Sequence, residues 1–471
     1  MLSNEDRVWT IVESKSAAYF DLSDKIWDAP ELNYQEFTAA SLHADLLKRE
    51  GFSIKSGVAG MPTAVMGEAG KDGPVIAFLG EYDALPGLSQ EAGVARHQPL
   101  IVGGPGHGCG HNMLGAAALL AAASIKEWLR TAGLPGRVRY YGCPAEEGGS
   151  SKGFMVKEGA FDDVDVAICW HPSAFTGVFR AISLACVDVD FTFHGRASHA
   201  AVSPELGRSA LDAVELMNIG VNYMREHMPS TARIHYAMID GGGVAPNVVP
   251  AKAIVRHLVR AATLGEMWQL LERVKKIAQG AALMSETIVE IEQLTGDANL
   301  VENTVLEEAM QRSLMRLGAP EFDDADRRFA AEIQKTLSRE DIAADYARFG
   351  LPIRLEPLFD GIYPLDHAVK PYGSTDVGTV SWVIPTVQCN VACFAPGTPF
   401  HSWQLVAQGK APAAHKGIAV AAKAMAGLAK DLFTENGLLS AAKEEFRTFR
   451  DANEFRNPIG MEMTPPLEIS A

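Results

Sequence analysis

Short apolar runs alternate with helical segments through the first third of the chain. The run at residues 74–80, PVIAFLG, holds branched side chains between a proline and a glycine, which is typical of a buried strand. Residues 137–143 and 164–170 are strand-like too, and the Ala/Leu-rich segment 113–133, which ends at a glycine, predicts a long helix. This alternation predicts a largely parallel sheet covered on both faces, with sites at the carboxyl ends of its strands.

The pattern changes between residues 187 and 294. Strands are expected at 187–195, 233–240, 251–261 and 287–294, and helices at 205–227 and 264–282. The order β-α-β-β-α-β is that of a ferredoxin-like unit. We therefore expect a second domain at 187–297, inserted into a first domain made of 1–186 and 298–471.

After the insertion the first domain is expected to resume. Helices are predicted at 301–318 and 411–434, and sheet at 379–396. Between them, an extra segment at about 321–370 opens with a charged stretch of helical composition, and its residues indicate no chemistry of their own.

Composition narrows the classes of function. The chain has 471 residues with 47% apolar and 21% charged side chains, which is ordinary for a globular protein of two or three folding units. Its net charge of −16 argues against nucleic-acid or anionic-membrane partners. No apolar run approaches the roughly 20 residues of a membrane span, and the first residues lack the pattern of a signal peptide. Six cysteines in so long a chain are no disulfide framework, so we expect a soluble cytoplasmic protein.

The segment 103–112, GGPGHGCGHN, is the first candidate for chemistry. His107, Cys109 and His111 alternate among five glycines just before the predicted helix. In an extended chain alternate side chains share one side, so Cys109 and His111 could reach one ion. The alternative is a flexible loop with incidental histidines, but a Cys-x-His pair within such a glycine cluster favours a metal site.

Adjacent carboxylates follow the strand at 137–143. Glu146 and Glu147 point to different sides in a near-extended chain, so one can bind a metal while the other acts as a general base toward water. Asp83 follows the strand at 74–80 in the same way. Each also has a plainer interpretation, a solvated acidic turn for the glutamates and a turn-forming aspartate for Asp83.

Two further histidines and a group of residues in the second domain complete the candidates. His171 ends the strand at 164–170 and His401 lies in PGTPFHSW, where each is either a metal ligand or a packed histidine. Sulfur, nitrogen and oxygen donors together favour Zn²⁺, Mn²⁺ or Co²⁺ over Mg²⁺ or Ca²⁺.

The candidates in the second domain are His199, Asn247, Arg256 and Arg260. The two arginines lie four apart on one strand face and suit carboxylate recognition, unless they form surface ion pairs.

The order DALP, GHGCGHN, PAEEGG, WHP, GRASHAA, PNVVP and FHS resembles that of the metal-dependent aminoacylase and carboxypeptidase G superfamily. The Cys-Gly-His element is similar to the branch that contains hippurate hydrolase and plant auxin-conjugate amidohydrolases, and within it to the members that use aminobenzoyl-glutamate. The resemblance covers roughly residues 25–428. It implies an α/β fold, in which a zinc-peptidase-like three-layer catalytic domain with a mixed sheet is interrupted by a ferredoxin-like lid or dimerisation domain.

The resemblance also implies roles for single residues. It implies two divalent ions per site, Mn²⁺ or Zn²⁺, with the ligands Cys109, His111, Glu147, His171 and His401. Glu146 matches the general base, Asp83 the aspartate that orients a ligating imidazole, and His199 the histidine that stabilises the tetrahedral intermediate. Asn247 and Arg260, with Arg256 nearby, match the part of the lid that holds a substrate carboxylate.

The implied activity is hydrolysis of an amide between an aryl or acyl group and an amino acid, with p-aminobenzoyl-glutamate or a similar N-acyl acidic amino acid as substrate. We expect a homodimer, or assembly with a homologous second subunit. Two alternatives stay open: a metallo-dipeptidase and a non-catalytic partner subunit.

The chain departs from the pattern of the family in three places. Glu81 stands where many members place a ligating histidine, Asn112 stands where the branch has aspartate, and the segment 321–370 is longer than usual.

Overall fold

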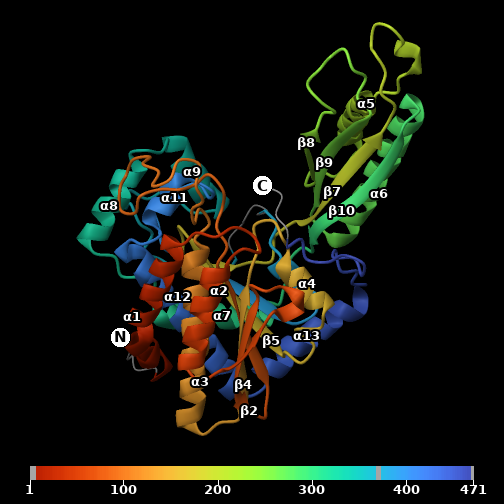
Figure 1. Cartoon of the computed structure of the whole chain (residues 1–471). Coiled ribbons are helices and arrows are strands. Elements are labelled where there is room, and N and C mark those ends of the chain that lie inside the picture. Colours follow the sequence, from red (N-terminus) through yellow and green to blue (C-terminus); the bar gives the residue numbers. More distant parts are fainter. Residues whose placement is uncertain (1–6, 367–372, 468–471) are drawn as a thin grey trace.

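The computed structural model describes residues 7–366 and 373–467. A seven-stranded sheet forms the centre of the larger lobe, in the order β1-β2-β4-β3-β5-β11-β6 (Figure 1). The strands are β1 (Ser53–Ser56), β2 (Val65–Lys71), β3 (Val75–Glu81), β4 (Gly136–Cys143), β5 (Val166–Ser173), β6 (Gly177–Phe179) and β11 (Thr386–Ala392). Strands β4, β3, β5 and β11 are parallel, whereas β1, β2 and β6 add antiparallel edges. The mixed sheet that the resemblance implies is therefore confirmed.

Helices cover both faces of this sheet. One face carries α1 (Arg7–Asp28), α2 (Phe37–Arg49), α3 (His111–Ala132), α7 (Thr304–Leu317) and α12 (Pro412–Thr434), whose apolar sides share the largest core with the strands. The alanine-rich sequences of α3 and α12 let these two helices pack closely on the sheet. The other face is covered by α4 (Ser151–Lys157) and α10 (Val377–Ser381) around a second apolar cluster. Three layers result, as expected.

The smaller lobe contains a four-stranded antiparallel sheet in the order β10-β7-β9-β8. Its elements are β7 (Ala185–His194), α5 (Ala210–Met224), β8 (Arg233–Asp240), β9 (Lys252–Ala261), α6 (Leu264–Ser285) and β10 (Ile288–Asp297), which confirms the ferredoxin-like order. The helix expected at 205–227 is shorter, because Ser209 caps its start by accepting a hydrogen bond from the Asp212 N–H. The two helices cover one face over a core of their own.

The smaller lobe stands away from the larger one (Figure 1). Ala185 of β7 and Asp297 of β10 lie at its attached end, and His194 pairs with Ile288 at the far end. The sheet is thus anchored at one end and reaches out at the other. We keep the division at 187 and 297 as a proposal, which these strand ends support.

The sheet expected at 379–396 begins too early. Residues 377–381 form the short helix α10, and the strand β11 starts only at Thr386. A helix of five residues is too short to reveal a helical period, so its apolar residues could not be told from a strand.

Two helices, α8 (Asp324–Gln334) and α9 (Arg339–Arg348), account for the charged part of the segment at 321–370; residues 367–370 of that segment lie outside the described residues. Within the described part of the chain no helix combines the length and apolarity needed to cross a membrane.

Candidate metal centre

The predicted site residues of the larger lobe follow the carboxyl ends of three neighbouring parallel strands. Asp83 comes two residues after β3, Glu146 and Glu147 follow β4, and His171 lies near the end of β5. The carboxyl ends of parallel strands meet at one edge of a sheet, so these side chains are brought together.

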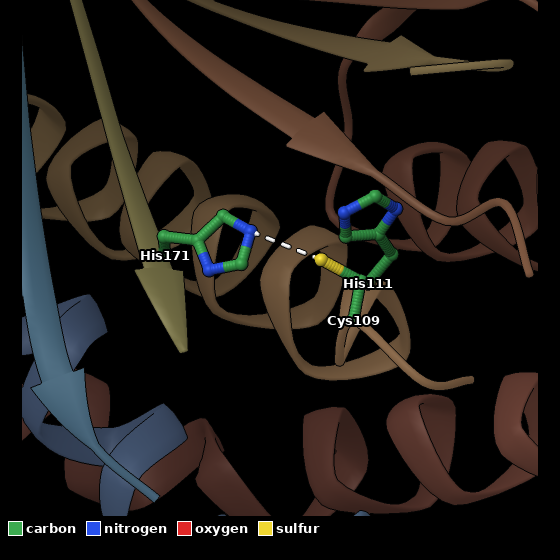
Figure 2. A group of neighbouring side chains, drawn as sticks. All are labelled: Cys109, His111 and His171. Atoms are coloured by element: carbon green, nitrogen blue, oxygen red, sulfur yellow. Dashed lines mark hydrogen bonds between the residues drawn. The ribbon is translucent and has the colours of Figure 1, made fainter. Parts of the chain in front are cut away.

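The glycine-rich segment adds Cys109 and His111 from the start of α3. Gly110 adopts a left-handed backbone with φ of 81°, and α3 begins at His111, so the chain turns here and is not extended. A side chain at position 110 would meet Pro172 and Met113, which explains the glycine. The turn itself makes the two donors converge. The Cys109 Sγ lies 3.5 Å from the His171 Nε2 and, in Figure 2, Cys109 and His111 face His171 across the site.

Asp83 connects two of the predicted ligands. Its Oδ1 lies 2.8 Å from the His111 Nδ1, and its Oδ2 accepts the Glu147 backbone N–H at 2.9 Å. The Asp83 side chain is fully buried. A carboxylate at Nδ1 favours the proton there and leaves the His111 Nε2 with a lone pair that points into the site.

Glu147 and His401 form the exposed side of the cluster. The Glu147 Oε2 lies 3.2 Å from the His401 Nε2, and its Oε1 lies 4.0 Å from the His111 Nε2. The His401 backbone N–H donates to the Gly108 carbonyl at 2.8 Å, which ties this late loop to the glycine-rich segment. The His401 side chain is 52% exposed, so the cluster opens to solvent on this side.

The chemistry of the donor atoms fits a bound cation. Both the His111 Nε2 and the Glu147 Oε1 are buried without a hydrogen-bond partner. Three sets of donor atoms lie within 4.8 Å of one another: Cys109, His111 and His171; Cys109, Glu147 and His401; and Glu81, His111 and Glu146. Thiolate, imidazole and carboxylate donors at this spacing suit a transition-metal ion such as Zn²⁺ or Mn²⁺.

The electrostatics of the cluster favour a cation as well. Burial and the negative charges of Glu81 and Glu147 raise the pKa of Glu146 well above its usual range. Burial and the charge of Glu147 likewise raise the pKa of the Cys109 thiol. A divalent cation nearby stabilises the charged form of both groups, so cation binding and proton release are coupled here.

The predicted residues of the smaller lobe lie apart from this cluster. His199 and Asn247 come from neighbouring loops at the far end of the lobe, where the Ala200 N–H donates to the Asn247 carbonyl at 2.9 Å. Arg256 makes a bidentate pair with Asp190 at 2.7 and 2.9 Å, which is the ion pair weighed as its alternative role. Arg260 pairs with Cys186 in the strand register and so lies at the attached end.

Three buried residues around the site were not predicted as part of it. Lys152 and Asp376, which lie 224 positions apart in sequence, form a buried ion pair that also includes Glu81. Glu36 accepts the Ala145 N–H at 2.8 Å and so supports the left-handed backbone (φ 53°) of the residue before Glu146. Burial and the charge of Asp83 raise the pKa of Glu36 to about 8. No pattern in the sequence signals these contacts.

Comparison with known proteins agrees with this geometry. The family model for peptidase family M20/M25/M40 matches residues 77–340. A subunit of the p-aminobenzoyl-glutamate hydrolase of Escherichia coli is 45% identical over 97% of this chain and 98% of its own, and the Xaa-Arg dipeptidase of Mus musculus is 30% identical over 90% and 88%. A dinuclear metal-binding M20 peptidase of Bacillus subtilis shares the fold with a TM-score of 0.56, at 17% identity over 87% of this chain and 98% of its own. The chain therefore belongs to peptidase family M20/M25/M40 and is an amidohydrolase of that family, homologous to the Escherichia coli protein.

Proposed function

We propose that this chain hydrolyses the amide between an aromatic acyl group and an acidic amino acid, with p-aminobenzoyl-glutamate as the leading substrate. The observation that carries the proposal is the convergence of Cys109, His111, Glu147 and His171 beside Glu146 at one edge of the sheet. The relative named for hydrolysis of p-aminobenzoyl-glutamate aligns with 97% of the chain, which supports this choice of substrate.

Two cation positions follow from the donor sets. Cys109, His111 and His171 would hold one cation, and Cys109, Glu147 and His401 would hold the other. We assign Mn²⁺ or Zn²⁺ to both, because borderline metals accept nitrogen, sulfur and oxygen donors together. Such ions supply Lewis-acid polarisation of the scissile carbonyl and a lower pKa for the attacking water.

The remaining residues move protons and bind substrate. Glu146, left outside both donor sets, accepts the proton of the attacking water and returns it to the leaving amine. His199 accepts the backbone N–H groups of Ala201 and Val202 at its Nδ1, at 3.2 and 3.3 Å, so its Nε2–H is free to donate to the developing oxyanion. Arg260 and Asn247 hold the substrate carboxylate, and Arg256 adds positive charge although Asp190 engages its guanidinium.

The positions of these lid residues favour a homodimer. His199 and Asn247 lie at the far end of the smaller lobe, whereas Arg260 lies at its attached end, roughly 25 Å away along β9 at about 3.3 Å per residue. One substrate can contact both ends only if the lobes of two copies contribute. The Escherichia coli relative is named as one subunit of a hydrolase. The second form of this proposal is therefore an assembly in which a homologous second subunit takes the place of the second copy.

The edge strand β8 offers a surface for such pairing. Seven of its eight residues are exposed, among them Tyr236, Met238 and Ile239, and no strand pairs with its outer edge in the described residues. An exposed edge strand with apolar side chains readily pairs with another chain.

A cytoplasmic location completes the proposal, because all six cysteines are free.

A metallo-dipeptidase is the second candidate, favoured by the 30% identity with the Xaa-Arg dipeptidase of Mus musculus. A non-catalytic subunit is the third, and the intact set of donors and Glu146 argue against it. A panel assay separates the three. Protein loaded with Mn²⁺ or Zn²⁺ is offered p-aminobenzoyl-glutamate, hippurate, indoleacetyl-aspartate and dipeptides with arginine or other residues at the carboxyl end.

We expect release of p-aminobenzoate to be the fastest reaction of the panel. Cleavage of dipeptides alone would replace the proposal with a dipeptidase. Full metal occupancy with no cleavage of any compound would make the chain a non-catalytic subunit.

A further inference from the structure

A fully buried lysine lies beneath the metal centre, and the proposed function does not use it. The Lys152 Nζ lies 2.6 Å from the Glu81 Oε1 and 2.6 Å from the Asp376 Oδ1. The Lys152 backbone N–H also donates to the Asp376 Oδ2, at 3.0 Å. None of the three side chains is more than 4% exposed. A lysine is seldom buried so completely unless it is paired, so the two carboxylates are what stabilise Lys152 in this position.

The two carboxylates are not satisfied to the same degree. Asp376 uses both of its oxygens on Lys152, one on the ammonium group and one on the backbone N–H. Glu81 uses only its Oε1 in this way, and its Oε2 points toward the His111 Nε2 at 3.4 Å. The second oxygen of Glu81 is therefore left available to a cation bound beside His111.

The contact between Glu81 and the neutral imidazole of His111 suits a cation between the two atoms. Asp83 engages the His111 Nδ1, and this favours a lone pair on the Nε2. When the ring is neutral, as a metal ligand must be, the Glu81 Oε2 and the His111 Nε2 are two acceptors that face each other, and the Nε2 has no hydrogen-bond partner. A cation between them satisfies both. Glu81, His111 and Glu146 indeed form a donor set within 4.8 Å.

We propose that Glu81 is a further metal-binding residue of this centre, with its Oε2 offered to the same cation as the His111 Nε2 and with Lys152 holding the carboxylate in place. Lys152 balances one of the two negative charges beside it, and the other stays available to the cation. The inference rests on the metal centre of the proposed function, and it is independent of which amide is cleaved.

The test compares Glu81→Gln with the wild type in binding of metal to the metal-free protein. Glutamine keeps the size of the side chain and an oxygen that can accept from Lys152, but it removes the charge at the second position. Mn²⁺ or Zn²⁺ is titrated by calorimetry, and the visible spectrum of the Co²⁺-loaded protein reports the donors around the ion. We expect affinity for one of two equivalents to fall at least about tenfold, with a changed Co²⁺ spectrum.

A matched control is Glu68→Gln. Glu68, on β2, and Asp163 pair with the buried Arg139, although both carboxylates are more exposed than Glu81 and Asp376. Neither carboxylate belongs to the three donor sets. This variant is expected to bind both equivalents as the wild type does. If it lost metal affinity to the same extent, the effect of Glu81→Gln would reflect the loss of an ion pair to a buried cationic side chain, and the inference would be wrong.

Wild-type affinity, stoichiometry and Co²⁺ spectrum in Glu81→Gln would overturn the inference directly. If Glu81→Gln does not fold, Glu81→Asp keeps the charge and the pairing but shortens the reach by one methylene group. The same loss of metal then supports the inference, and an unchanged titration contradicts it. A failure of the metal centre itself shows differently, because the wild type would then bind no metal.

Discussion

At the scale of single residues, the site depends on side chains that each serve two partners. Asp83 is the clearest example, since one oxygen orients His111 and the other accepts the Glu147 N–H. Both partners are predicted ligands, so Asp83 positions two donors although it is in neither of the two donor sets assigned to the cations. Outer partners of metal ligands commonly matter to affinity almost as much as the ligands do.

The variant Asp83→Asn tests this positioning role. An amide cannot accept at both positions, so either the His111 ring or the Glu147 backbone loses its partner. We expect metal affinity to fall by about 10- to 100-fold while the fold is retained. Elemental analysis after dialysis against a range of free metal concentrations measures the change. Wild-type metal content across the whole range would show that Asp83 has no part in positioning the ligands.

His43 gives a prediction about pH that is independent of the metal centre. Its imidazole is buried between Tyr82 and Tyr140, and burial lowers its pKa from 6.5 to about 3. Below pH 6.5 the unfolded chain takes up a proton that the folded chain does not bind until about pH 3. Stability is therefore full above pH 6.5 and is lost as the pH falls, by about 2 kcal/mol at pH 5 for this one group.

The measurement is urea unfolding of the wild type and of His43→Gln between pH 8 and pH 5. Glutamine can still accept from the Tyr140 hydroxyl, which lies 2.7 Å from the His43 Nδ1. The free energy of unfolding should fall less steeply with decreasing pH in the variant. Parallel curves for the two proteins would mean that His43 is already protonated in the folded state or exposed to solvent.

At the scale of elements, the ends of the parallel strands bring the candidate metal ligands together, and the exposed edge strand β8 is the surface proposed for dimerisation. The variant Met238→Lys places a charge on the exposed edge of β8, where charges block strand pairing. We expect it to shift a dimer to monomers in sedimentation velocity, at concentrations where the wild type stays dimeric. Met315→Lys, on the exposed side of α7, is the matched control and should stay dimeric. A dimeric Met238→Lys would place the interface elsewhere.

Much of this arrangement could be predicted from the sequence. Strands β3, β4 and β5 and helix α3 are strongly patterned, and the motifs after these strands and at the start of this helix predicted a site where they meet. The pairing of Lys152 with Asp376 could not be predicted, because the partners lie far apart in sequence and a lysine in a short helix ordinarily faces solvent. The position of the turn at Gly110 could not be predicted either, since alternation among glycines fits an extended chain and a tight turn equally well.

At the scale of the whole molecule, each lobe holds only part of the residues that the proposed mechanism uses. Metal donors and Glu146 lie in the larger lobe, and His199 lies at the far end of the smaller one. This arrangement suits a site shared between two copies. Chains carrying His199→Ala and chains carrying Glu146→Gln should each be inactive, yet their mixture should recover about a quarter of wild-type activity, since half the dimers are mixed and each contains one intact site. A mixture that re-forms dimers and stays inactive would show that each site is built from one chain.

The central claim is that this chain is a metal-dependent amidohydrolase in which Glu146 acts as the general base. The most direct test is turnover of p-aminobenzoyl-glutamate by the metal-loaded wild type and by Glu146→Gln, with the metal content of both measured on the same samples. We expect equal metal content, release of p-aminobenzoate by the wild type, and a loss of turnover in the variant by at least about 100-fold. Near-wild-type turnover in Glu146→Gln with its metal in place would contradict this claim.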